Sequence, residues 1–89
     1  MKIKFRERFE KDLKKISDQK ILLQIKRVIL DIETAEKLSQ ISNLKKIKGH
    51  KIAYRIKLGD YRIGIYVDAQ IIEFTRVLHR KDIYKYFPK

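Results

Sequence analysis

Apolar residues in the first half of the chain recur at spacings that predict one strand and two helices. Residues 2–5 alternate between polar and apolar side chains, which is the period of a strand. Over residues 5–16 the apolar spacing becomes three and four, the period of one helix face, and a longer stripe of the same kind spans residues 21–32. Ser17-Asp18 lies between the stripes, where it ends the first helix and caps the second. Such a short connection predicts an antiparallel helical hairpin.

The middle of the chain carries weaker signals. Thr34 is expected to cap a short helical turn over residues 35–38. Residues 39–51, with the sequence SQISNLKKIKGHK, have no sustained apolar period and are expected to form a loop. The lysines of this loop are Lys45, Lys46, Lys48 and Lys51.

The second half of the chain predicts three strands. Residues 52–58 and 61–67 both alternate apolar and polar side chains with period two. Gly59-Asp60 between them suits a two-residue type II′ turn, which places Lys57 opposite Arg62. Like charges directly opposite each other destabilise a strand pair. This pair is therefore expected either to stay well solvated or to hold an anion.

A third strand is expected to follow a second turn at Asp68-Ala69 and to end near Leu78. After it, the sequence HRKDIYKYFPK is expected to form a basic, aromatic tail with one helical turn. The expected neighbours in this register are Ile65 and Ile72, Ile63 and Phe74, and Arg62 and Thr75.

The predicted architecture is β-α-α-β-β-β, an α+β fold. The helical hairpin packs on one face of a small, mostly antiparallel sheet. Residues 1–89 are expected to form a single domain, because a chain of this length leaves no room for a second. The other face of the sheet is expected to be open and to carry Arg55, Lys57, Arg62, Tyr66 and Thr75, with Arg80 just past its edge.

The charge balance narrows the expected partners. The chain has 23 Lys+Arg against 11 Asp+Glu, a formal net charge of +12. Such an excess favours polyanions, with nucleic acid first, an acidic protein second and an anionic membrane surface third. There is no cysteine and there are only two histidines, so no metal site and no cofactor are expected. No signal peptide and no membrane-spanning stretch are evident, which favours the cytoplasm.

The expected open face suits a phosphodiester substrate. It has no carboxylate pair, no Gly-rich phosphate loop and no Ser-His-Asp arrangement. Cleavage of RNA by its own 2′-OH needs a base, cations that hold the charge of the phosphorane, and an acid for the departing 5′ oxygen. Guanidinium groups suit the second task, and neighbouring cations disfavour the charged form of a lysine such as Lys57. A basic strand face is nevertheless more often a solvated or RNA-binding surface, and that alternative stays open.

Two segments resemble the RelE/ParE superfamily of bacterial and archaeal toxins. They are LKKIKGHKIAYRIKLGDYRIGIYVD and the ending EFTRVLHRKDIYKYF, and the likeness covers nearly the whole chain. The resemblance implies one of two activities on the same fold. RelE-like members enter the ribosomal A site and cut mRNA by the 2′-OH route, as ribosome-dependent, metal-free endoribonucleases. ParE-like members inhibit DNA gyrase. The cations and the late tyrosine of this chain favour the RelE-like branch.

The same resemblance implies residue roles. Lys57 matches the general base, Arg62 the group that stabilises the phosphorane, Arg80 the acid or leaving-group stabiliser, and Tyr84 an orienting or stacking group. Arg55 stands where lysine is usual and Leu78 where glycine is common, and the short spacing after Arg80 leaves Tyr86 or His79 as alternatives to Tyr84. The residues expected to bind RNA or the ribosome are Lys45, Lys46, Lys48, Lys51, Arg55, Tyr66, His79 and Lys81.

The resemblance also implies partners. Such toxins are made with an antitoxin that covers or distorts the basic site. A +12 surface suits an acidic antitoxin that is partly disordered when free and folds on binding. The other implied partners are mRNA in the ribosomal A site and ribosomal RNA, and no membrane.

Overall fold

A five-stranded sheet forms the centre of the molecule, in a computed structural model that describes residues 1–88. Its strands lie in the order β1-β5-β4-β3-β2, with β1 parallel to β5 and all other neighbours antiparallel. The strands are β1 (Lys2–Phe5), β2 (Leu44–Lys46), β3 (Ala53–Leu58), β4 (Tyr61–Asp68) and β5 (Ile71–His79). The helices are α1 (Glu7–Lys14), α2 (Gln19–Thr34), the 3-10 helix η1 (Leu38–Gln40) and α3 (Ile83–Tyr86).

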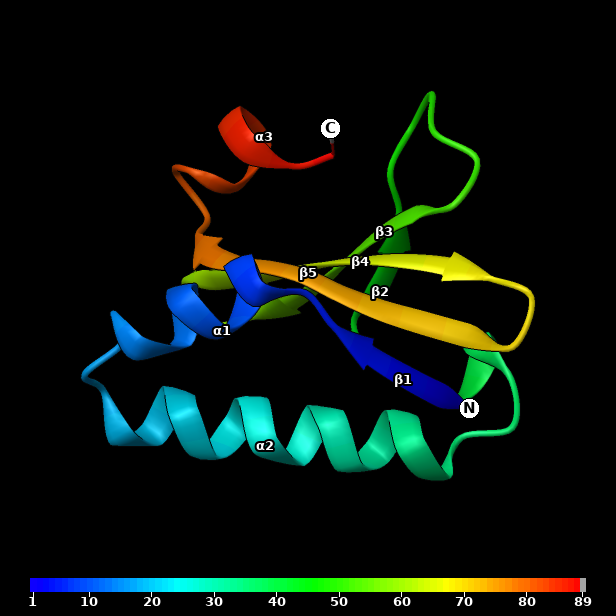
Figure 1. The fold of residues 1–89 in the computed structure, drawn as a ribbon, viewed down its shortest axis with the longest axis horizontal. Coiled ribbons are helices and arrows are strands. Elements are labelled where there is room, and N and C mark those ends of the chain that lie inside the picture. The colour runs from blue at the N-terminus through cyan, green and yellow to red at the C-terminus, as the bar shows by residue number, and fades with distance from the viewer. Residues whose placement is uncertain (89) are drawn as a thin grey trace.

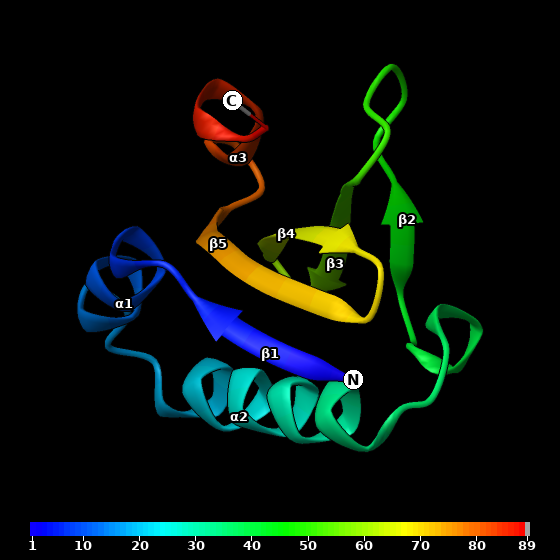
Figure 2. The same cartoon turned by 45° about the vertical axis from the view of Figure 1, so that its right-hand side comes forward.

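The helices cover the sheet from two sides. The first two, α1 and α2, run in opposite directions along one face, and α3 lies over the other (Figures 1 and 2). The predicted α+β fold with a helical hairpin on a mostly antiparallel sheet is therefore confirmed. The predicted cap between the helices is also confirmed, because the Asp18 carboxylate accepts the backbone N–H groups of Lys20 at 2.9 Å and Ile21 at 3.4 Å.

The main core lies between the helical hairpin and the sheet. Phe9 of α1 is fully buried against Phe74 of β5, with ring centroids 5.3 Å apart in an edge-on arrangement. The residues of α2 that reach this core follow the predicted stripe, since Ile25 and Ile32 are almost completely buried. The alternation of β3 and β4 places their apolar members here, namely Ile56, Ile63, Ile65 and Val67.

A small second core covers part of the sheet face that was expected to be open. Ala53, Ile83 and Phe87 are buried together on this face. The Phe87 ring lies directly over Gly64 of β4, so close that a Cβ atom there would be 2.6 Å from the ring carbons. The expectation of a fully open face is therefore wrong, because the C-terminal tail folds back over the middle of the sheet.

The connection after α2 differs from the prediction. Thr34 does not cap a following turn, because its hydroxyl donates to the carbonyls of Leu30 and Asp31 within α2. The helical turn forms later, as η1, where the Gln40 side-chain oxygen accepts the backbone N–H of Glu36 at 2.7 Å. The expected loop over 39–51 also contains strand β2, which pairs with β3.

The register of the last hairpin also differs from the prediction. Its two-residue turn is Ala69-Gln70, one residue later than expected, with Ala69 at φ +53°. A β-bulge opposite Gly64 and Ile65 then adds a further residue to β5. None of the three expected neighbours is therefore observed. The observed pairs are Val67 with Ile72, Ile65 with Phe74, Ile63 with Val77 and Arg62 with Leu78.

Candidate nucleic-acid interface

The predicted pairing of Lys57 with Arg62 is present in the β3–β4 hairpin. The two residues are cross-strand partners, so their side chains share one face of the sheet. Gly59 has φ +60° and Asp60 does not have positive φ, which fits the predicted type II′ turn. The Arg62 guanidinium donates to the carbonyl oxygens of Gly59 at 2.7 Å and Tyr61 at 2.9 Å. Lys57 is exposed.

Arg80 joins this pair from the end of β5. Its backbone N–H donates to the carbonyl oxygen of Asp60 at 2.7 Å. Its guanidinium Nε lies 3.8 Å from the Asp60 carboxylate, in an exposed ion pair. The hairpin turn therefore brings together three cations, here called the turn cluster: Lys57, Arg62 and Arg80.

A row of basic residues crosses the same face of the sheet behind the turn cluster. Register places Lys45 beside Arg55, Arg55 beside Gly64, and Gly64 beside Arg76. The Arg55 guanidinium donates to the carbonyl oxygen of Asn43 at 3.3 Å. Phe87 lies over Gly64 in the middle of this row, so it separates Arg55 from Arg76.

Other predicted contact residues do not lie in this group. Lys46 is opposite Tyr54, whose ring packs against the main core, so Lys46 belongs to the helix side of the sheet. His79 is opposite Tyr61, and the centroids of these two rings are 5.9 Å apart. Tyr61 also packs against the main core. The His79 Nδ1 atom accepts the backbone N–H of Lys81 at 3.1 Å. These observations place His79 away from the face of the turn cluster.

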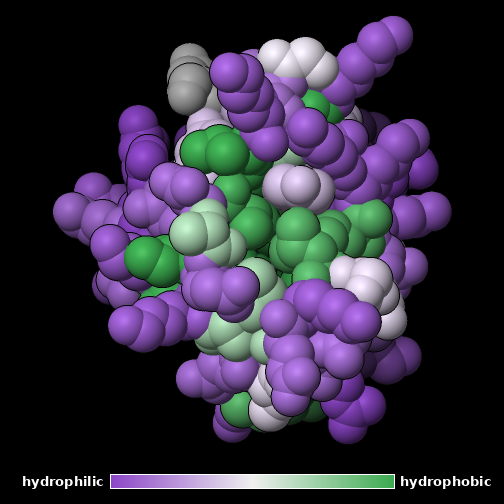
Figure 3. Space-filling view, turned by 90° about the vertical axis from the view of Figure 1, so that its right-hand side faces the viewer, coloured by the Kyte–Doolittle hydropathy of each residue, from purple (hydrophilic) through white to green (hydrophobic). Residues whose placement is uncertain are grey.

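The remaining predicted residues lie around the C-terminal tail and the loop before β3. Tyr66 is half-buried against Phe87, with ring centroids 5.0 Å apart. Tyr84 is 60% exposed on α3. Lys48 is exposed in the loop before β3, and Lys51 lines a cavity of about 640 Å³ that extends to Tyr66. At the end of the molecule that carries the turn between β4 and β5, Figure 3 shows an apolar area surrounded by hydrophilic side chains.

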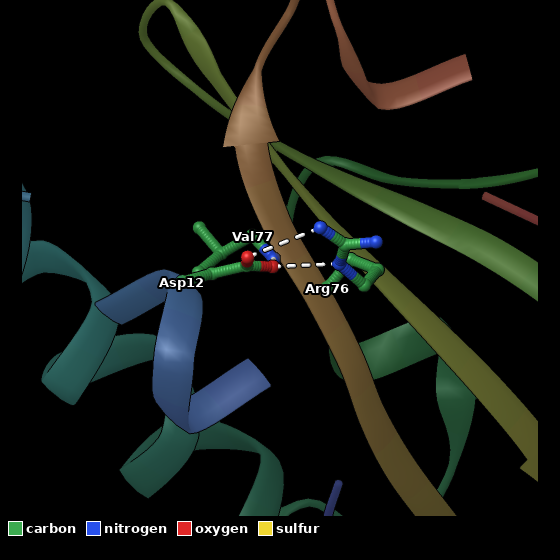
Figure 4. A network of polar contacts seen from close by, with 3 residues as sticks. All are labelled: Asp12, Arg76 and Val77. Carbon is green, nitrogen blue, oxygen red and sulfur yellow. Dashed lines mark hydrogen bonds and ion pairs between the residues drawn. The ribbon is translucent and has the colours of Figure 1, made fainter. Parts of the chain in front are cut away.

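One buried charged group was missed by the sequence reasoning. Asp12 of α1 is 4% exposed and forms a two-bond ion pair with Arg76 of β5, at 2.8 Å to Nε and 3.1 Å to Nη2 (Figure 4). The same carboxylate accepts the backbone N–H of Val77 at 3.1 Å. A signal was available, because Asp12 interrupts the apolar stripe between Phe9 and Leu13, and a carboxylate in a core needs a cation.

Comparison with known proteins identifies the family. Residues 3–84 match the family model described as the ParE toxin of the type II toxin–antitoxin system parDE. The chain is 46% identical to Toxin RelE3 of Methanocaldococcus jannaschii, over 99% of this chain and all of that protein. The chain belongs to the RelE/ParE superfamily as a RelE-like toxin of a toxin–antitoxin system.

Solved structures support the same assignment. The RelB–RelE antitoxin–toxin complex from Methanococcus jannaschii matches with a TM-score of 0.82 and 45% identity, over 96% of this chain and 99% of that one. The RelE–RelB complex from the archaeon Pyrococcus horikoshii matches with a TM-score of 0.73 over 92% of this chain and 97% of that one, at 19% identity, which supports the fold alone. Among residues 1–88 no helix has the length and apolar character needed to cross a bilayer.

Proposed function

We propose that this toxin is a ribosome-dependent endoribonuclease that cuts mRNA through its own 2′-OH, without a metal. The turn cluster carries the proposal. Lys57 and Arg62 are opposite each other on one sheet face, and Arg80 is tied to the same turn by its backbone N–H. A phosphodiester bound there meets two guanidinium groups and one amine, which suits the charge that develops on a phosphorane.

The proposed roles follow from the chemistry of each group. Lys57 takes the proton of the 2′-OH as a neutral amine, because it alone of the three cationic side chains can become a neutral base by losing a proton. Arg62 stabilises the phosphorane, and Arg80 stabilises or protonates the leaving 5′ oxygen. Tyr84 orients or stacks on the substrate. Tyr84 is favoured over Tyr86 for this role because the Tyr86 ring is already packed against Arg76. Tyr84 lies about 200° around α3 from Tyr86, so it points in another direction.

The proposed partners follow the charge of the chain. In the cytoplasm, mRNA in the ribosomal A site and ribosomal RNA would meet Lys45 and Arg55 next to the turn cluster, and Lys48 and Lys51 in the loop before β3. A RelB-like antitoxin is the proposed protein partner, because the structure matched at 45% identity is a RelB–RelE complex. An acidic sequence, partly disordered when free, suits a toxin with net charge +12.

The test is induced expression followed by primer extension on cellular mRNA. The proposal expects cuts at fixed positions within codons, insensitive to chelators when the purified protein is added to ribosomes. Lys57→Ala and Arg62→Ala should each abolish the cuts and the toxicity. Lys26→Ala, an exposed residue of α2 on the opposite side of the sheet, should leave both unchanged. Full toxicity of both turn-cluster variants would refute the proposed mechanism.

A second candidate is inhibition of DNA gyrase. The family model that matches residues 3–84 is described as the ParE toxin, which favours gyrase inhibition. A supercoiling assay with purified gyrase separates the two. Inhibition by the pure protein, together with mRNA that stays intact during expression, would replace the ribonuclease proposal with the gyrase one.

A further inference from the structure

A cationic pocket, separate from the turn cluster, lies on the same face of the sheet. It has a volume of about 360 Å³, within the range of roughly 300–1,000 Å³ that is usual for small-ligand sites. It is built where the start of α1, the middle of β5 and the C-terminal tail meet. We call it the arginine pocket, and the lining residues used here are Arg6, Arg8, Thr75, Arg76, Tyr66 and Tyr86.

The arginine pocket is distinct from the turn cluster. Phe87 also lines the pocket, and its ring covers Gly64, which lies between Arg55 and Arg76 in the cross-strand row. Phe87 therefore stands between the pocket and the basic residues of β2 and β3. An anion in the arginine pocket is a different group from one held by the turn cluster.

The β-bulge in β5 aims two consecutive residues at this pocket. Phe74 and Val77 both enter the main core, so Thr75 and Arg76 between them both face the other way. Regular alternation would have sent one of the two into the core. Bulges of this kind redirect side chains next to functional sites.

Arg76 is held rigidly in the pocket with donors to spare. Its side chain is 13% exposed, and two of its N–H groups bond to the Asp12 carboxylate. A guanidinium has five N–H donors, so three remain after these two bonds. The Tyr86 ring lies 5.2 Å from the guanidinium carbon, which leaves the group sandwiched between an anion and an aromatic face.

The other two arginines leave the pocket with surplus positive charge. Arg6 pairs with Glu73 at 2.9 Å. Arg8 is exposed, and within the described part of the chain it forms no ion pair or side-chain hydrogen bond. Among residues 1–88, two of these three arginines are paired with a carboxylate, Arg6 with Glu73 and Arg76 with Asp12, and Arg8 has none. A tetrahedral oxyanion suits forked guanidinium donors better than it suits lysine.

We propose that the arginine pocket binds a phosphate of single-stranded RNA, one that belongs to a nucleotide other than the one cut at the turn cluster. Arg8 and the free donors of Arg76 hold the phosphate, Asp12 acts as a positioning residue for Arg76, and Tyr86 offers a ring to the neighbouring base. The choice of RNA as the ligand rests on the proposed function. The pocket and its surplus charge are observed in the structure and do not depend on that proposal.

The test measures binding of a fluorescent 2′-O-methyl RNA, which lacks the nucleophile and cannot be cut. The oligonucleotide is about 12 nucleotides long, within the usual range of single-strand site sizes, and the full-length protein is titrated at several salt concentrations. The variant is Arg8→Gln. The matched control is Lys14→Gln, which removes one charge from another exposed position of α1.

Arg8→Gln should weaken binding about tenfold at low salt and lower the slope of log affinity against log salt by about one unit, as loss of one phosphate contact requires. Lys14→Gln should change affinity less than about twofold, since it makes no contact of this kind. Tyr86→Leu should weaken binding without changing the salt slope, because stacking releases no counterions.

Two results would overturn the proposal. Equal losses for Arg8→Gln and Lys14→Gln would mean that net charge alone sets the affinity. Equal weakening of poly-glutamate and RNA binding by Arg8→Gln would make the pocket a carboxylate site for an acidic protein. The binding assay involves no cleavage, so it is independent of the ribonuclease test. Intact mRNA in cells would refute the proposed ribonuclease, whereas a lower salt slope for Arg8→Gln would still show that Arg8 contacts a phosphate.

Discussion

Replacing Asp12 by alanine should cost the protein a large part of its stability. The substitution leaves Arg76, whose side chain is 13% exposed, without its carboxylate, and it leaves the backbone N–H of Val77 without its acceptor. Removing one partner of a buried ion pair costs about 3–5 kcal/mol, because the other charge stays desolvated. The Val77 N–H that loses its acceptor accounts for part of this loss, since an unsatisfied buried donor costs about 1–3 kcal/mol.

That loss is large relative to the whole. A chain of 89 residues has a free energy of unfolding of about 4–13 kcal/mol. With a urea dependence of about 1.5 kcal/mol per molar, the unfolding midpoint should fall by about 2–3 M. The measurement is urea unfolding followed by circular dichroism of the helices.

Two further variants separate the cost of an unpaired charge from the worth of the pair. Glu7→Ala breaks the exposed pair with Lys11, which spans one helical turn at 3.4 Å, and should cost less than about 0.5 kcal/mol. Asp12→Leu combined with Arg76→Met removes both charges and should recover the cost of the unpaired charge. A loss of about 1–3 kcal/mol should remain, because the Val77 N–H still lacks its acceptor. Equal midpoint shifts for Asp12→Ala and Glu7→Ala, or a double variant as unstable as Asp12→Ala, would contradict a large cost for the unpaired Arg76 charge.

Three other substitutions test separate features. Gly64→Ala should destabilise the protein by about 1–3 kcal/mol in urea unfolding, because its Cβ would lie 2.6 Å from the Phe87 ring; addition of Phe87→Leu should recover part of the loss. Asp18→Ala should cost about 1 kcal/mol in the same assay, since it removes the cap of α2, and no change would contradict the cap. Lys57→Arg keeps the charge but provides no removable proton, so it should abolish mRNA cutting in primer extension while 2′-O-methyl RNA still binds; retained cutting would exclude Lys57 as the base.

The parts of the fold that could be predicted from the sequence are those encoded by a local period. The stripe over 21–32 determines which face of α2 is buried. Period two on both sides of Gly59-Asp60 determines that Lys57 and Arg62 meet. Both features depend on residues close together in the chain, so no distant contact is needed to derive them.

The missed features depend on partners that are distant in the sequence. Strand β2 has only three residues, and it is ordered by hydrogen bonds to β3 rather than by a period of its own. The register of β5 depends on its bulge, next to which Val77 donates its N–H to Asp12, 65 residues away. No pattern near residue 76 encodes that contact.

Gly64 shows how a weak local signal can point to a distant contact. A glycine inside a strand often marks close approach by another group, and here that group is Phe87. The sequence alone could indicate that something approaches β4 at this point. It could not identify the tail, because HRKDIYKYFPK is short and mostly polar and its apolar residues have no clear period.

The partners of each cation distinguish the charges that hold the fold together from those that can bind a ligand. Arg76 is mostly buried, so it requires the internal carboxylate of Asp12. Within residues 1–88, the Arg62 guanidinium bonds only to backbone carbonyls, and Lys57 opposite it is exposed. Because like charges across two strands repel each other, the pairing of Lys57 with Arg62 destabilises the free protein, and a bound phosphate would relieve the repulsion. Opposed cations such as Lys57 and Arg62, rather than the net charge of +12, therefore mark the surface on which an anion gains most.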